Sequence, residues 1–270
     1  MKTTTALNPK QVELLKFISK FRFVTVAHIQ NNFNLKSRPS VNLKLNVLIK
    51  TGHIGRLYDR SYRQVNKPAS FYLTPKGLRE IQKHLPYITD AIIKNSYGDK
   101  RASDSLVDES ARLLELSKSL ATNYPAIKAL TARQLGDIEY MPKPLPSLYL
   151  ALKVGDSTSR YFLYYLQDSK RYDVAVSSKI ARLVKYRESE DYARSGNDFP
   201  VILLVCDSAA IERLAGRTIG SALNKSFESM QAYTTSHQSL LQQRSRDRAL
   251  WSSVDDPDSL ISLDDIESSS

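Results

Sequence analysis

The longest uninterrupted apolar stretch in this 270-residue sequence is VILLVC, from Val201 to Cys206. A helix that crosses a bilayer needs about 20 apolar residues, so the sequence predicts no membrane-spanning segment. A short run that is apolar at every position is instead typical of an interior strand whose sheet is covered on both faces. The run therefore predicts an α/β domain in which helices pack against both sides of a sheet.

The ends of the chain and its cysteine content favour the cytoplasm. The N-terminal sequence MKTTTALNPK lacks the hydrophobic region of a signal peptide. Cys206 is the single cysteine, and it and the four histidines show no spacing typical of a zinc site. No glycine-rich phosphate loop and no nucleophile elbow follows a predicted strand. We expect a cytoplasmic protein without a cofactor, a metal site or a membrane contact.

Positive charge is concentrated at the N-terminal end of the chain. Residues 1–100 contain 18 lysines and arginines against five acids, a net charge of +13, whereas residues 251–270 contain six acids and no base. A domain this basic is typical of polyanion binders, because each phosphate that a cation neutralises releases condensed counterions. Lysines that serve only solubility would give the same charge. Charge therefore favours double-stranded DNA as a partner. A sequence motif is needed to distinguish DNA binding from a charge that serves only solubility.

The first hundred residues contain three helical segments followed by a hairpin. Asn8, Pro9 and Gln11 form the start of a first helix, Thr25 begins a second, and Ser37 begins a third. A strand is expected over residues 53–59, a basic tip over 60–69, a returning strand over 70–73 and a fourth helix after that. The segments LNVLIKTGHIGRL and FYLTPKGL resemble winged-helix DNA-binding proteins. That resemblance implies a winged helix-turn-helix domain over residues 1–95.

In winged-helix proteins the third helix and the wing meet the groove and the backbone of DNA. Side chains at a helix N-terminus can reach base edges, and cations on a hairpin can reach phosphates. The alternative is a winged helix that serves protein contacts as an adaptor. The predicted base or near-base contacts are Arg38, Ser40, Asn42 and Lys44, with Ser37 at the start of the helix, and the predicted phosphate contacts are Arg56, Arg60, Arg63 and Lys67.

Beyond the basic domain the sequence predicts a linker, a second domain and a tail. Residues 96–105 are polar and rich in turn formers, which indicates a linker. Residues 106–250 are expected to form a helix, strands at 135–140, 148–154 and 161–166, a long helix, the apolar strand and a further helix. The acidic residues 251–270 are expected to be disordered. The chain is thus predicted to be a two-domain α+β or α/β protein.

Five segments in the second half of the chain carry a family resemblance. The segments KPLPSLYLAL, YFLYYLQDSKRYDVAVSSKIARLVKYRE and FPVILLVCDS, with the later AYTTS and ALWSSV, resemble the replication-relaxation family of bacterial mobile elements. The resemblance implies a winged helix followed by a restriction-endonuclease-like domain. It also implies a role in plasmid replication or in DNA relaxation and mobilisation, and we add transcription regulation as a further setting, with replication or transfer proteins as candidate partners. A second copy of the chain is a further candidate partner, because winged helices often read paired half-sites.

Nucleases of this type hold metal ions with a carboxylate after a proline and an acid-x-acid-like pair on the next strand. Here the corresponding positions read Pro146-Ser147 and Tyr164-Tyr165-Leu166, and the family's lysine and tyrosine correspond to Lys179 and Tyr186. We therefore expect no catalytic residues. The alternative is an endonuclease with a relocated metal site, for which the candidates are Asp168, Glu139 and Lys153.

Overall fold

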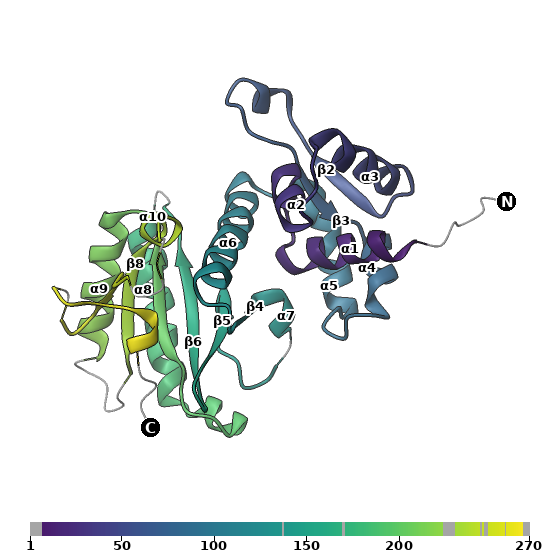
Figure 1. The fold of residues 1–270 in the computed structure, drawn as a ribbon. Coiled ribbons are helices and arrows are strands. Elements are labelled where there is room, and N and C mark those ends of the chain that lie inside the picture. Colours follow the sequence, from purple (N-terminus) through teal and green to yellow (C-terminus); the bar gives the residue numbers. More distant parts are fainter. Residues whose placement is uncertain are drawn as a thin grey trace. The chain divides into compact units, whose positions relative to one another are not determined.

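The computed structural model describes residues 7–136, 138–168, 171–223, 230–243, 245, 248–256 and 258–266, with the backbone alone at residues 60, 154 and 223. The chain divides into two compact units, residues 1–114 and residues 115–270. The boundary lies inside helix α6 (Asp104–Asn123). Figure 1 shows the elements of both units along the chain.

Unit 1 consists of helices around a small antiparallel sheet whose strand order is β1-β3-β2. A helix precedes β1, two helices lie between β1 and β2, and a short 3-10 helix, η1, lies in the β2-β3 connection. The elements are α1 (Pro9–Phe21), β1 (Val24–Thr25), α2 (Val26–Asn32), α3 (Arg38–Lys50), β2 (Ile54–Leu57), η1 (Arg60–Arg63), β3 (Ser70–Leu73), α4 (Pro75–Gln82), α5 (Asp90–Asn95) and η2 (Ser96–Arg101).

Local capping explains where the first two helices begin. The Asn8 side chain accepts the Gln11 N–H at 2.9 Å, and the Gln11 side chain accepts the Asn8 N–H at 2.9 Å. Thr25 and His28 exchange the same pair of bonds at the start of α2, with His28 Nδ1 as one acceptor. A reciprocal pair of this kind satisfies two of the N–H groups that a helix leaves without intrahelical partners.

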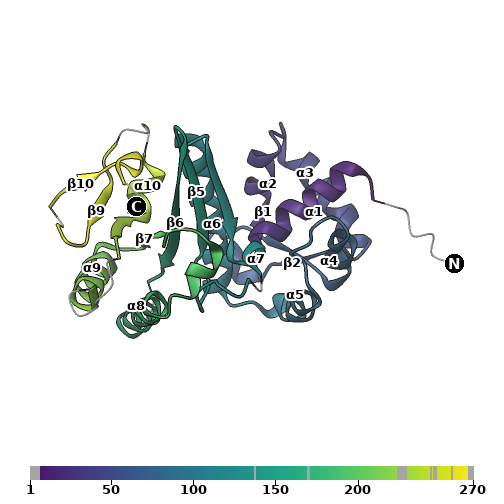
Figure 2. The same ribbon diagram turned by 90° about the horizontal axis from the view of Figure 1, so that it is seen from below.

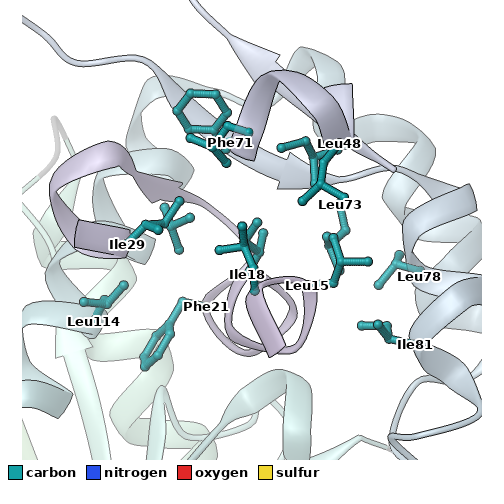
Figure 3. Packing of buried hydrophobic residues seen from close by; sticks show 14 of the residues in the cluster. Leu15, Ile18, Phe21, Ile29, Leu48, Phe71, Leu73, Leu78, Ile81 and Leu114 are labelled. Carbon is teal, nitrogen blue, oxygen red and sulfur yellow. The ribbon is translucent and has the colours of Figure 1, made fainter. Parts of the chain in front are cut away.

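The core of unit 1 forms where α1 meets the sheet and α4. Figure 3 shows Leu15 of α1 beside Leu73, Leu78 and Ile81, with Ile18 of the same helix next to Leu15. Each of these five side chains is buried. Burying a leucine or isoleucine contributes about 1.5–3 kcal/mol, so the apolar faces of these elements hold the unit together.

An ion pair between the partly exposed Arg22 and a buried carboxylate joins the end of α1 to η2. Asp99 is 1% exposed, and its Oδ1 accepts hydrogen bonds from Arg22 Nε at 3.0 Å and from Arg22 Nη2 at 2.7 Å. Within the described residues, Asp99 Oδ2 has no hydrogen-bond partner. Arg22 therefore neutralises a carboxylate that water does not reach.

Replacing Arg22 by alanine is expected to lower the free energy of unfolding of unit 1 by about 2 kcal/mol, because it leaves a buried charge unpaired. The matched control is Arg79→Ala, which removes an exposed arginine of α4. Urea unfolding followed by far-UV circular dichroism measures both variants. Equal stability of the two would show that the ion pair does not hold η2 in place.

Unit 2 contains a seven-stranded mixed sheet with the strand order β10-β9-β8-β7-β6-β5-β4. Strands β6, β7 and β8 are parallel, and the pairs β4-β5, β5-β6, β8-β9 and β9-β10 are antiparallel. The elements are β4 (Ile127–Thr131), α7 (Ala132–Leu135), β5 (Leu148–Val154), β6 (Ser157–Leu166), α8 (Tyr172–Glu188), η3 (Asp191–Ser195), β7 (Val201–Cys206), α9 (Ala209–Leu223), β8 (Ala232–Ser236), α10 (His237–Leu241), β9 (Trp251–Ser253), β10 (Leu260–Ile261) and η4 (Leu263–Asp265).

The two faces of this sheet have different coverings. Helices α8 and α9 lie side by side along one face (Figure 2), where Phe162 and Tyr164 of β6 join their apolar residues. On the other face, the Tyr161 hydroxyl donates to the Leu263 carbonyl at 3.3 Å, and the Tyr165 ring lies 5.7 Å from that of His237. Every residue of β7 is buried, as expected for an interior strand. The α/β expectation for this part of the chain is confirmed as a mixed sheet with helices.

Three expectations from the sequence are wrong. Residues 96–105 do not form a linker, because they include η2 and the buried Asp99 and they lead directly into α6. Residues 135, 136 and 138–140, the described part of the strand expected at 135–140, do not form a strand, because α7 ends at Leu135, Gly136 has φ +56, and residues 139–140 form a turn, whereas β4 lies just before α7. The tail is ordered wherever it is described, with the buried residues Trp251, Leu263 and Ile266.

Among the described helices, none combines the length and the apolar character that crossing a bilayer requires.

Candidate nucleic-acid interface

The position of α3 in unit 1 decides which of its side chains can meet a ligand. Val41, Leu45 and Leu48 are buried against the core, so they fix the rotation of the helix about its axis. The Ser37 hydroxyl accepts the Ser40 N–H at 3.4 Å and so caps the helix. Ser37 was expected to be a DNA contact, and the structure gives its hydroxyl a structural partner as well.

The predicted base contacts of α3 lie on two different flanks of the helix. At about 100° per residue, Arg38 and Asn42 fall on one flank, whereas Ser40 and Lys44 fall on the other. Arg38, Asn42 and Lys44 are exposed and Ser40 is half-buried. A single groove therefore cannot receive all four side chains in equivalent ways.

The most outward face of α3 holds residues that the sequence analysis did not select. Leu43, Asn46 and Lys50 lie opposite the buried stripe, and all three are exposed. Leu43 is 69% exposed and Val47 is 48% exposed. A helical projection centred opposite Val41 and Leu45 would have found them, because a 3.6-residue period fixes both faces at once.

A groove of about 640 Å³ lies beside this face, between the start of α1, the end of α2 and α3. Lys44 and Val47 reach its wall from α3, so this flank of the helix is turned toward α1. The apolar part of the lining is Leu14, Ile29, Phe33, Leu35, Val41, Leu43 and Val47.

The β2-β3 hairpin carries the predicted phosphate contacts. Arg56 and Arg63 are exposed, and the Arg56 guanidinium lies 4.8 Å from the centre of the Tyr58 ring. A cation held over an aromatic face keeps its charge available to a second partner. The side chain of Arg60 lies outside the described residues.

Lys67 differs from the other predicted contacts because it is already paired. Its Nζ lies 3.1 Å from Asp104 Oδ1 and 3.0 Å from Asp108 Oδ1, both at the start of α6. The Tyr62 hydroxyl also donates to Asp104 Oδ1 at 2.8 Å, and Lys67 Nζ lies 5.2 Å from the centre of the Tyr62 ring. The two carboxylates thus occupy the position that a phosphate would take on Lys67. We call these four residues the hairpin latch.

The electrostatics of the hairpin latch agree with its geometry. Burial alone would lower the pKa of Lys67, but the hydrogen bonds to Asp108 and Asp104 outweigh burial and raise it. The hydrogen bonds from Tyr62 and then from Lys67 lower the pKa of Asp104. The lysine therefore stays charged and the carboxylate stays ionised at neutral pH, which maintains the attraction.

In unit 2, the expected metal-binding positions of a nuclease are occupied by groups that bind one another. The Ser147 hydroxyl accepts the Tyr165 N–H at 3.1 Å, and Lys179 Nζ donates to the Tyr165 carbonyl at 3.4 Å. The Asp207 carboxylate accepts the Tyr165 hydroxyl at 2.8 Å and the Asp168 N–H at 3.2 Å. Among the described residues, no group of three or more histidine, cysteine or acidic side chains could hold a metal ion.

The relocated metal site considered from the sequence cannot assemble. Lys153 pairs with Thr158 near the beginning of β6, whereas Asp168 follows the end of β6 at Leu166. At about 3.3 Å per residue, roughly 30 Å separate these two positions. A site that joins Asp168, Glu139 and Lys153 is therefore wrong for this topology.

Two further residues of unit 2, Tyr186 and Cys206, have structural contacts that account for them. The Tyr186 hydroxyl donates to the Tyr140 carbonyl, which ties α8 to the segment before β5. Cys206 is fully buried at the end of β7, and burial raises the pKa of its thiol. A thiol that stays protonated is a poor nucleophile, so Cys206 serves packing.

Comparison with known proteins gives little further information. No family model matches this chain, and no curated protein matches it. Among solved structures, restriction endonuclease FokI aligns with 88% of this chain at 11% identity and a TM-score of 0.33. This chain spans 44% of the FokI chain. The resemblance to the replication-relaxation family stays a prediction from the sequence.

Proposed function

We propose that unit 1 is a winged-helix domain that binds double-stranded DNA. One observation carries the proposal: exposed cations of α3 and of the β2-β3 hairpin belong to one compact unit whose first hundred residues carry a net charge of +13. In this arrangement α3 enters the major groove while Arg56 and Arg63 of the hairpin contact phosphates.

The proposal is tested by the fluorescence anisotropy of a labelled 30-base-pair duplex in 50 mM salt. The unmodified chain is expected to bind, and Arg63→Ala is expected to weaken all duplex sequences alike, by about threefold to tenfold. The matched control is Lys94→Ala, which removes an exposed cation from α5. A folded chain that does not bind any duplex would overturn the proposal and favour the adaptor alternative.

Arg38→Ala separates base reading from positioning. Arg38 is exposed in the first turn of α3, where a side chain can reach base edges. The variant is expected to change the preferred duplex sequence, which selection of bound duplexes from a random pool measures. A uniform loss over all sequences would place Arg38 on a phosphate instead.

We propose that unit 2 has no catalytic role and that it supports assembly or partner contacts. This rests on Ser147 and Tyr165 at the positions where carboxylates are expected. Incubation of supercoiled plasmid with Mg²⁺ or Mn²⁺ should leave the plasmid intact. Nicking that a single carboxylate substitution abolishes would make the protein an endonuclease.

The biological setting is proposed from the sequence resemblance alone. It is the replication, mobilisation or transcriptional control of a plasmid or other mobile element in the cytoplasm, with a second copy of the chain or a replication or transfer protein as partner. Sedimentation of the chain with and without its selected duplex tests whether two copies bind one site.

A further inference from the structure

The outward face of α3 carries two parallel rows of side chains. Asn42, Asn46 and Lys50 form one row at spacings of four residues, and Leu43 and Val47 form the neighbouring row. All five side chains are exposed. Among the described contacts, the amides of Asn42 and Asn46 take part in no side-chain hydrogen bond. An amide row therefore lies beside an apolar row, and both are open to a ligand.

The chemistry of these rows matches the major-groove edge of A·T pairs. An asparagine amide can donate to adenine N7 and accept from adenine N6, and an apolar side chain can pack on the thymine methyl group. Helix α3 contains no acidic residue that could accept from cytosine. Two asparagines four residues apart are about 6 Å apart along the helix, which is comparable to one or two base-pair steps.

The charges around the rows indicate the same partner. Arg38, Lys44 and Lys50 are exposed on α3. Cations at the border of a face attract the phosphates on either side of a groove. The same cations repel other basic surfaces. The exposed Leu43 thus lies on a cationic surface, which complements a polyanion.

Resting on the proposed duplex binding, we infer that α3 reads A·T pairs, with Asn42 and Asn46 on adenine and Leu43 and Val47 on thymine methyl groups. Burying one methyl group stabilises a complex by about 0.8 kcal/mol, which is about a fourfold change in affinity. Each thymine that contacts this row is therefore expected to matter through its methyl group and not only through its base pairing.

The test uses the duplex that is selected from a random pool, synthesised with thymine or with uracil, which lacks the methyl group. The unmodified chain is expected to select an A·T-containing site and to bind the uracil duplex about fourfold more weakly per contacted methyl group. Leu43→Ala should reduce the preference for thymine over uracil by about fourfold, the effect of one methyl contact, and the double variant Leu43→Ala, Val47→Ala should bind both duplexes with nearly equal affinity. The control Val174→Ala, which truncates a 62% exposed side chain of α8, should keep the full difference.

The possible results of this test distinguish a failure of A·T reading from a failure of duplex binding. Binding without A·T preference, or equal affinity of the unmodified chain for thymine and uracil duplexes, overturns this inference and leaves duplex binding intact. A double variant Leu43→Ala, Val47→Ala that keeps the full thymine preference moves the methyl contacts away from α3. A folded chain that binds no duplex overturns both the inference and the proposed function.

Discussion

Replacing Gly77 by alanine is expected to lower the free energy of unfolding of unit 1 by at least about 3 kcal/mol, the upper range of overpacking effects. An alanine Cβ at this position would lie 2.1 Å from the His53 carbonyl oxygen. That oxygen also accepts the Thr74 N–H at 3.1 Å and the Thr74 hydroxyl at 3.1 Å. It cannot move away without loosening the cap of α4, so the clash has no inexpensive relief.

A destabilising effect of Gly77→Ala would be opposite to that of an ordinary glycine-to-alanine substitution in a helix. A helix with an interior glycine is normally less stable than the same helix with alanine by about 1 kcal/mol. Gly216 of α9 provides the matched control, because among the described residues a Cβ added there would meet no atom within 4 Å outside its own stretch of helix. Gly216→Ala is therefore expected to stabilise unit 2 by about 0.5–1 kcal/mol.

The measurement can separate the two units because the chain has one tryptophan. Trp251 is 1% exposed and belongs to unit 2, so its fluorescence reports the unfolding of that unit. Gly77→Ala should lower the circular dichroism transition in urea and leave the fluorescence transition unchanged. Unchanged circular dichroism for Gly77→Ala would contradict the close approach of α4 to β2.

The starts of helices and the interior strand were accessible from the sequence because local interactions determine them. Asn8 with Gln11 and Thr25 with His28 cap their helices through residues three positions apart. The interior strand β7 could likewise be predicted from its six consecutive apolar residues alone. A pattern that depends only on residues close together in the sequence can be interpreted without knowing the rest of the fold.

The candidate site was accessible only in part because its geometry depends on distant residues. The rotation of α3 is set by the core, so Leu43 and Asn46 were missed although their residue types were in view. The hydrogen bond between Tyr62 and Asp104 joins positions 42 residues apart. No local sequence pattern predicts a contact at that separation. Gly77 likewise looks like a poor helix residue until the His53 carbonyl is placed beside it.

The error at residues 135–140 has a similar origin. Ile138 and Tyr140 flank the polar Glu139, and this short alternation favours a strand. Gly136 instead ends α7 with a positive φ, and Ile138 and Tyr140 pack against the apolar cluster of unit 2 from a turn. Alternation over a few residues cannot distinguish a strand from a turn whose side chains are also half-buried.

Raising the salt concentration from 50 to 200 mM is expected to weaken duplex binding by roughly 150-fold. Apart from the base-reading Arg38, the described side chains of the interface include four exposed cations, Lys44, Lys50, Arg56 and Arg63. Each phosphate contact contributes about −0.9 to the slope of log affinity against log salt, which gives a slope of about −3.6 for four contacts. Titration of the same duplex at several salt concentrations measures the slope, and a flat dependence would contradict duplex binding through these cations.

Opening the hairpin latch is expected to change the salt dependence of duplex binding. In the double variant Asp104→Asn, Asp108→Asn, Lys67 loses both carboxylates and becomes available to a fifth phosphate, so the slope should steepen to about −4.5. The double variant Glu80→Gln, Asp90→Asn removes as much negative charge from unit 1 without touching Lys67, and it should keep the original slope. If the latch variant binds more tightly with an unchanged slope, the two carboxylates repel DNA and Lys67 makes no phosphate contact.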